Sequence, residues 1–321
     1  MENRIERSVR RDITNKLIRA LAMFIPGRSD ESLLTILSNL NLWMADENEK
    51  DEVLAKLNAQ IFNTPGKDIP KLLIDLFPFF NNLILNEIAV LFVTTLEKFP
   101  EDSLPSYIMN HRELVGTLYS YIEKPYLSNT SQTIFRHCII NSETFTRFVY
   151  TKGFFSSFIE FLTGDNLEQL ITAFATYDAI LNSHPDISAD YCTRNWSFVQ
   201  LQFKQIMTSP NYPVQLTFLP ILVKFLTLEP CLYCLYCYLE DLENLKFVFY
   251  LLDGSSKKVQ TQAYNLLKLF VVNPKKTKTI KETIASNKKK LARIIRKVQM
   301  DDDAPEFEEE RQEVIMLIEN M

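Results

Sequence analysis

The amino-acid sequence predicts an all-α protein, a right-handed helical-repeat solenoid of the armadillo or HEAT kind with about six or seven repeats. Apolar residues recur three and four positions apart, which places them on one face of a helix. Residues that end helices recur at a nearly constant interval, and the 321 residues include only 6 glycines. Such scarce glycine favours helices joined by short polar turns over glycine-rich nucleotide-binding folds.

The first expected helix covers residues 1–20, where Ile5, Val9, Ile13 and Leu17 share one face. A transit peptide is the alternative, because the same stretch contains five arginines, but acidic residues interrupt the positive charge. Apolar stripes predict further helices around residues 33–40, 72–77 and 84–92.

The repeat is marked by five similar segment ends, at Pro100, Glu143, Pro185, Pro230 and Pro274. The intervals between them are 43, 42, 45 and 44 residues. Proline lacks a donor N–H and restricts the residue before it, so we expect a helix to end there. A period of about 40–47 residues is typical of armadillo and HEAT repeats. A further unit is expected around residues 54–77, and we expect the aromatic segments 76–80 and 154–158 to lie between repeats rather than on a binding surface.

We therefore expect one helical-repeat domain over residues 1–321. Residues 1–119 form weakly assigned N-terminal repeats, 120–297 the C-terminal repeats, and 298–321 an acidic linker with a capping helix that starts at Phe307. Residues 275–297 hold ten lysines or arginines and a single acid, Glu282, and seven acids follow between 301 and 310. The simple interpretation is an acidic end segment folded beside a basic last repeat. The alternative is a basic strip for RNA or acidic lipid.

Composition and charge limit the possible partners. The net charge of −5 argues against nucleic acid as the main partner, and no run of about 18 apolar residues predicts a membrane span. Five cysteines, an odd number with no secretory signal before them, predict a reducing, cytoplasmic location. We expect a monomer that binds neither nucleic acid nor membrane.

The sequence contains no recognisable catalytic motif. Phosphate loops, dinucleotide fingerprints and nucleophile elbows are absent, and the three histidines (His111, His137 and His184) lie far apart. We therefore predict a protein that is not an enzyme and uses no cofactor. Cys231, Cys234 and Cys237 superficially resemble an iron–sulfur ligand run. A fourth ligand is missing nearby and cysteine is readily buried, so core packing is the prediction and a metal site the alternative.

From about Ser120 onward, several stretches occur in the same order and at nearly the same spacing as in one known family. They are residues 135–139 (Phe-Arg-His-Cys-Ile), 173–177 (Ala-Phe-Ala-Thr-Tyr), 209–212 (Ser-Pro-Asn-Tyr), 243–246 (Glu-Asn-Leu-Lys), 259–260 (Val-Gln) and 268–277 (Lys-Leu-Phe-Val-Val-Asn-Pro-Lys-Lys-Thr). On these residues the chain resembles the calcium-binding protein 39 family, also called mouse protein 25. The resemblance implies an armadillo-like scaffold that binds and activates sterile-twenty-type protein kinases or pseudokinases. It implies a concave groove for the kinase and a C-terminal pocket for a Trp-Glu-Phe-type tail, but no calcium site.

The chain departs from the family pattern at several cationic positions. Gln215 and Leu216 stand where the family has a Lys-Arg pair, Asp253 replaces an arginine and Ser286 a lysine, whereas Lys290 matches. In the groove, Leu167 replaces a phenylalanine and Glu229 an arginine. These changes predict that the partner's tail has diverged toward an apolar tail without a central acid.

The predicted protein-binding residues are Arg136, Leu167, Phe174, Tyr212, Leu216, Phe249 and Lys290. Packing is the alternative for each, and it is the favoured role for Phe174 and Tyr212. On the same fold, a generic adaptor for another protein partner in trafficking or transport is the alternative function.

Overall fold

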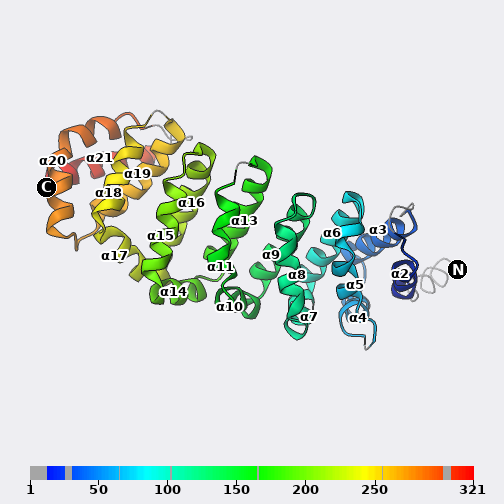
Figure 1. Cartoon of the computed structure of the whole chain (residues 1–321). Helices are drawn as coiled ribbons and strands as arrows, with labels where there is room; N and C mark the ends of the chain where they lie inside the picture. Colours follow the sequence, from blue (N-terminus) through cyan, green and yellow to red (C-terminus); the bar gives the residue numbers. More distant parts are fainter. Residues whose placement is uncertain are drawn as a thin grey trace. The chain divides into compact units, whose positions relative to one another are not determined.

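A computed structural model describes residues 13–25, 31–64, 66–101, 103–164, 166–254, 256–298 and 305–321. These residues form helices and turns and no β-strand (Figure 1), so the predicted all-α class is confirmed. The chain divides into two compact units. The first comprises Met1–Phe155 and Ala175–Ser183, and the second Ser156–Phe174 and His184–Met321.

The first unit is built from helices of unequal length. They are α2 (Ile13–Ala22), α3 (Glu31–Ala45), α4 (Asp51–Phe62), α5 (Ile69–Asp75), the 3-10 helix η1 (Phe77–Phe79), α6 (Asn82–Lys98), α7 (Leu104–Asn110), α8 (Glu113–Ile122), α9 (Pro125–Asn141) and α10 (Glu143–Thr151). The amphipathic helix expected at the N-terminus corresponds in part to α2, which buries Leu17 and Leu21. Residues 1–12 of that prediction lie outside the described residues.

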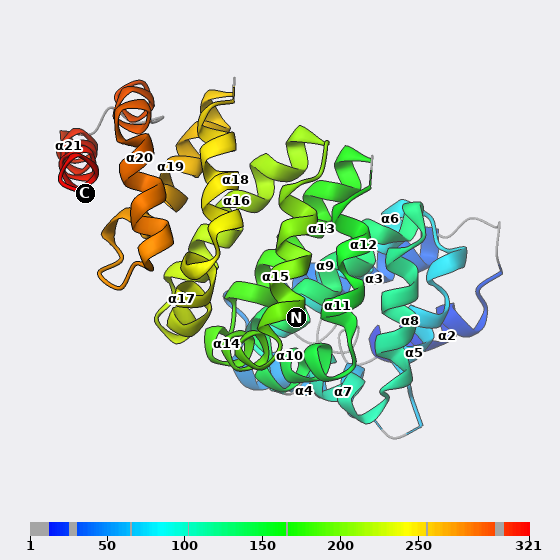
Figure 2. The same ribbon diagram turned by 60° about the vertical axis from the view of Figure 1, so that its left-hand side comes forward.

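The second unit continues the same pattern. Its helices are α12 (Ile159–Leu162), α14 (Pro185–Arg194), α15 (Trp196–Met207), α16 (Tyr212–Thr227), the 3-10 helix η2 (Glu229–Cys231), α17 (Leu232–Glu240), α18 (Leu242–Leu252), α19 (Lys257–Val272), α20 (Lys278–Ile295) and α21 (Pro305–Glu319). Helices α11 (Phe154–Ser157) and α13 (Leu167–Asn182) each contain one boundary between the units, and a third boundary follows Ser183. Within the second unit α16 packs on α19, α18 on α19, and α20 on α21 (Figure 2).

The expected repeat is visible in where five long helices stop. Helices α6, α9, α13, α16 and α19 end at Lys98, Asn141, Asn182, Thr227 and Val272, which are 41 to 45 residues apart. Each end lies within three residues of the predicted position. Pro185 and Pro230 differ in detail, because each occupies the first turn of the next helical segment. Proline is tolerated there, since the N–H that it lacks would have had no intrahelical partner.

Hydrogen bonds between neighbouring repeats follow the same period. In the first unit, Thr176 Oγ1 donates to Gln132 Oε1 (3.3 Å), 44 residues away, and Asn41 Nδ2 donates to the Glu87 carbonyl (2.9 Å), 46 residues away. In the second, Gln202 Nε2 donates to the Ser156 carbonyl at a separation of 46 residues. These buried polar groups therefore find their partners one repeat along the chain, which fixes the register of adjacent helices.

Two glutamines close the ends of helices in successive repeats. Gln215 Nε2 donates to the carbonyls of Met207 (3.0 Å) and Ser209 (3.1 Å), at the end of α15. Gln260, 45 residues later, donates in the same way to the carbonyls of Leu252 (3.1 Å) and Gly254 (2.7 Å), at the end of α18. The last carbonyls of a helix lack intrahelical partners, so each glutamine fulfils a structural need of the preceding helix.

Aromatic side chains form much of the core between helices. Phe77, Phe155 and Phe158 are fully buried, as the packing interpretation of segments 76–80 and 154–158 requires. Phe79 is the exception, with 53% of its surface exposed. Among the described residues no single helix is long and apolar enough to cross a membrane, although one bent pair, α16 with η2 and α17, reaches the required length and composition.

Asp241 joins α15 to α18 and begins α18. Its Oδ1 accepts the Glu243 backbone N–H (2.8 Å), and its Oδ2 accepts Lys204 Nζ (2.7 Å) and the Gln200 side-chain amide. We expect Asp241→Ala to lower the free energy of unfolding by about 1.5–2 kcal/mol, since a cap contributes about 1 kcal/mol and a half-exposed ion pair less than that. Urea unfolding at neutral pH measures this difference.

The same substitution should lose its effect in acid. Burial alone would raise the pKa of Asp241. The hydrogen bonds from Lys204 and from the Glu243 amide together outweigh this effect, so the pKa lies below its ordinary value of 3.8. A depressed pKa means that the stabilisation is present above the ordinary value and is lost as the pH falls through the folded-state pKa. Asp190→Ala is the matched control, because its pair with Arg194 is exposed. An equal loss of stability in both variants at neutral pH would contradict the assignment.

Candidate protein-binding surface

Arg136 lies on α9 in the first unit, where it is half-buried. Burial lowers the pKa of its guanidinium, and it makes no ion pair or hydrogen bond with any described residue. Tyr126 and Ile140 are exposed on the same helix, at 53% and 43%. Arg136 is thus a partly desolvated cation with no anionic partner among the described residues, one helical turn before the exposed Ile140. A partner carboxylate could stabilise it by a charge-assisted hydrogen bond.

Helix α13 carries two of the predicted residues, and the structure separates their roles. Leu167 is 56% exposed, and Ile171, one helical turn later, is 61% exposed. Phe174 is only 1% exposed, which agrees with the packing role rather than with direct contact to a partner. Ile171 was not predicted as a binding residue, because helical periodicity alone does not say which apolar positions of a helix stay uncovered.

Four predicted residues lie on α16, α18 and α20 of the second unit. Tyr212 is 43% exposed, and its hydroxyl is 2.5 Å from Ser256 Oγ, at the start of α19. Leu216 and Phe249 are half-buried, and Lys290 is exposed. Tyr212 therefore combines a structural hydrogen bond with exposed ring surface.

Lys290 is not a free cation. Its Nζ donates to Asp253 Oδ2 at 2.9 Å, which links α20 to the end of α18. Asp253 occupies a position where the family resemblance implies an arginine. The resemblance thus implies two cations at positions 253 and 290, whereas this chain has an ion pair without net charge there. Ser286, at another implied lysine position, donates to the Glu282 carbonyl of its own helix (2.7 Å).

Gln215 and Leu216, which replace the Lys-Arg pair of the family, also provide no positive charge. The amide of Gln215 is committed to the end of α15, as described above, and Leu216 offers only apolar surface. Only the acid at position 253 and the retained lysine at position 290 could have indicated the ion pair from sequence. Described residues at the positions of the implied tail pocket therefore present little positive charge.

A cavity of about 410 Å³ lies between α15 and α18. It is lined by Lys204, Met207, Thr208, Glu243, Asn244, Lys246 and Phe247. None of the predicted binding residues is among them. Its lysines are paired with carboxylates, Lys204 with Asp241 and Lys246 with Glu243, so the cavity carries compensated charge.

The cysteine run belongs to the core. Cys231 and Cys234 are fully buried, near buried Cys192, and Cys237 is partly exposed. Burial raises the pKa of Cys231 to about 12 and also raises the pKa of Cys192 and Cys234. Thiols with raised pKa are poor metal ligands, because metals bind the thiolate. The chemistry of these side chains therefore supports the packing interpretation.

Comparison with known proteins places the chain in a family. A family model described as Mo25-like matches residues 11–321. The Mo25-like protein of Schizosaccharomyces pombe is 25% identical over 92% of this chain and 90% of its own length. The degreening-related gene dee76 protein of Auxenochlorella protothecoides is 29% identical over 67% of each chain. Calcium-binding protein 39-like from Mus musculus is 24% identical over 77% of this chain and 70% of its own length.

Solved structures show the fold alone. The crystal structure of an engineered protein has a TM-score of 0.51 and 13% identity, covering 81% of this chain and 96% of that one. The structure of Uso1-1 has a TM-score of 0.52 and 13% identity, covering 87% of this chain and 46% of that one. The family resemblance expected from the sequence is confirmed by the match over residues 11–321, and the chain belongs to the Mo25-like family.

Proposed function

We propose that this protein is a non-catalytic scaffold that binds and activates a sterile-twenty-type protein kinase or pseudokinase. The observation that carries the proposal is membership of the Mo25-like family along nearly the whole chain, which supports an adaptor role. Exposed apolar side chains on long helices, such as Leu167 and Ile171 on α13, provide surface suited to a protein partner.

Activation needs no chemistry from the scaffold. A protein that binds the closed, active conformation of a kinase more tightly than the open one raises the population of the closed state. The size of the effect is limited by the difference between the two affinities. Arg136, Leu167, Tyr212, Leu216 and Phe249 are the residues we assign to partner contact.

The partner's tail is expected to differ from a Trp-Glu-Phe-type tail at its centre. Leu216 supplies no charge, and the Asp253–Lys290 ion pair offers none in net terms. A buried glutamate without a cationic partner is costly. A tail with an apolar or neutral polar central residue suits these side chains better.

The experiment that tests the function is affinity purification of the tagged protein from its native cells, followed by mass spectrometry. We expect a sterile-twenty-type kinase or pseudokinase to be enriched. The purified catalytic domain should then bind the scaffold directly, and an active kinase should phosphorylate a peptide substrate faster in its presence.

A different result would favour the adaptor alternative. If kinases are absent and the same trafficking or transport proteins are recovered in replicate experiments, the kinase proposal is wrong. Direct binding without any change in kinase rate would contradict activation but not kinase binding.

A further inference from the structure

Helix α20 carries more positive charge than its neighbours neutralise. Three of its cations have partners. Lys290 pairs with Asp253, Arg296 pairs with Glu319 of α21 (3.2 Å), and Lys288 donates to the Glu319 carbonyl (3.4 Å). The expected packing of an acidic end segment beside a basic repeat thus accounts for Lys288 and Arg296, whereas the partner of Lys290 lies at the end of α18.

Three further cations have no such partners. The side chains of Lys289, Arg293 and Lys297 are exposed and make no ion pair or hydrogen bond with any described residue. They follow one another at four-residue intervals, the last in the turn just beyond α20, and we call them the α20 ridge. A helix rises about 1.5 Å per residue, so successive charges lie about 6 Å apart along the axis.

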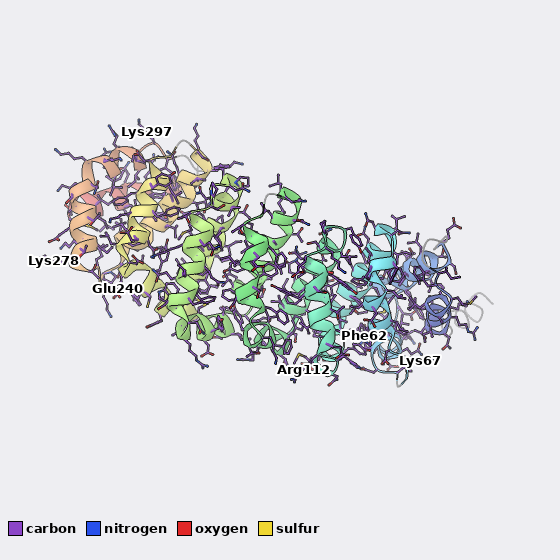
Figure 3. The ribbon with its side chains drawn as sticks, viewed as in Figure 1. Phe62, Lys67, Arg112, Glu240, Lys278 and Lys297 are labelled. Carbon is purple, nitrogen blue, oxygen red and sulfur yellow. The ribbon has the colours of Figure 1, made fainter. Side chains whose placement is uncertain are left out.

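Other cations extend the positive field to the start of the helix. Lys281 is also exposed and unpaired within the described residues, and Lys278 is 88% exposed beside Glu282. Burial lowers the pKa of Lys276, and the charge of Lys281 lowers it further. Figure 3 labels Lys278 and Lys297 at opposite ends of α20. Cations therefore lie in the first turn of α20 and again from Lys288 to the end of the helix, with none between residues 282 and 287.

We propose that the α20 ridge binds an acidic, extended segment of a protein partner. Alternate side chains of an extended strand share a face and lie about 6.6–6.8 Å apart, close to the spacing of the ridge. Acids at every second position of such a segment could therefore meet Lys289, Arg293 and Lys297 in turn. The ridge does not include the residues assigned to the tail, although Lys290 lies one helical turn before Arg293, and the proposal does not require the partner to be a kinase.

Two other polyanions fit the ridge less well. The exposed residues of α20 are all polar, so the helix has no apolar side chain to insert into a bilayer. Aromatic side chains, on which the bases of single-stranded nucleic acid stack, are also missing from its exposed positions. The adjoining helix α21 exposes Glu309 and Glu313, which would repel a broad anionic surface more than a single narrow strand.

The test uses the full chain and a fluorescein-labelled octapeptide of alternating glutamate and serine, with fluorescence anisotropy as the readout. We expect saturable binding that weakens with salt, and much weaker binding of the matching glutamine–serine peptide. The triple variant Lys289→Glu, Arg293→Glu, Lys297→Glu should lose at least about tenfold in affinity, because each exposed ion pair contributes modestly.

The control variant Lys56→Glu, Lys98→Glu, Lys258→Glu makes the same change in net charge at exposed lysines elsewhere. It should keep the affinity within about twofold, and circular dichroism should show both variants folded. Equal losses in the two variants would mean that only net charge matters and would overturn the proposal. The triple variant should also be tested with phosphatidylserine vesicles and with polyuridine. A larger loss of affinity for either of these than for the peptide would overturn the proposal.

Discussion

We expect the double substitution Leu216→Arg and Asp253→Arg to raise the affinity for a Trp-Glu-Phe peptide by about ten- to several-hundredfold. The change restores two cations of the family pattern and releases Lys290 from its ion pair. A hydrogen bond to a charged group contributes roughly 1.5–3 kcal/mol, and each 1.4 kcal/mol is a factor of about ten in affinity. The wild-type chain should bind Trp-Glu-Phe and Trp-Gln-Phe peptides with affinities within about twofold of each other. Isothermal titration calorimetry measures both.

The gain should depend on the glutamate, so binding of the Trp-Gln-Phe peptide should stay nearly unchanged. Leu201→Arg with Glu240→Arg is the matched control, because it makes the same kinds of substitution at exposed sites of α15 and α17. The proposed tail chemistry is wrong if the wild-type chain binds the Trp-Glu-Phe peptide tightly and the Trp-Gln-Phe peptide much more weakly. An equal gain in the control variant would point to unspecific attraction.

The largest loss of stability is expected from Phe203→Ala, at about 3–5 kcal/mol in the free energy of unfolding. Phe203, on α15, is fully buried, and its ring centroid lies 5.5 Å from that of Phe218 and 5.9 Å from that of Phe225, both on α16. Removing the ring leaves a cavity between two helices that few neighbours can fill. Urea unfolding followed by the fluorescence of nearby Trp196 reports on this region.

Phe198→Ala on the same helix is the control for that experiment. Phe198 is 44% exposed, so its truncation should cost less than about 1 kcal/mol. Similar effects of the two substitutions would contradict the orientation of α15. A cost below about 1 kcal/mol at Phe203 would mean that the two helices do not enclose its ring.

The repeat could be predicted from sequence because it depends on backbone chemistry. Prolines mark helix boundaries wherever they occur, and the ends at Lys98, Asn141, Asn182, Thr227 and Val272 lie close to the predicted positions. The exact role of Pro185 and Pro230 was less predictable. Proline terminates one helix and is also accepted in the first turn of the next, so the same residue type marks either side of a short turn.

The candidate site was harder to predict because it depends on which part of a helix its neighbours cover. Leu167 and Phe174 are seven residues apart, about two turns, and so lie on nearly the same face of α13. The first is nevertheless exposed and the second buried, a difference that the apolar periodicity of the helix does not specify. The Asp253–Lys290 pair joins residues 37 positions apart, a contact that no local pattern specifies.

The polar links between repeats, such as Thr176 to Gln132 and Gln202 to Ser156, span 44 and 46 residues. Each of these hydrogen bonds therefore joins residues a similar and modest distance apart in the sequence. Within each unit, native contacts can form without first bringing together residues that are far apart in the sequence. Folding can start in any repeat and spread to its neighbours, as in a row of coupled segments. A local defect should then lower the cooperativity of unfolding near itself while more distant repeats keep their protection from hydrogen exchange.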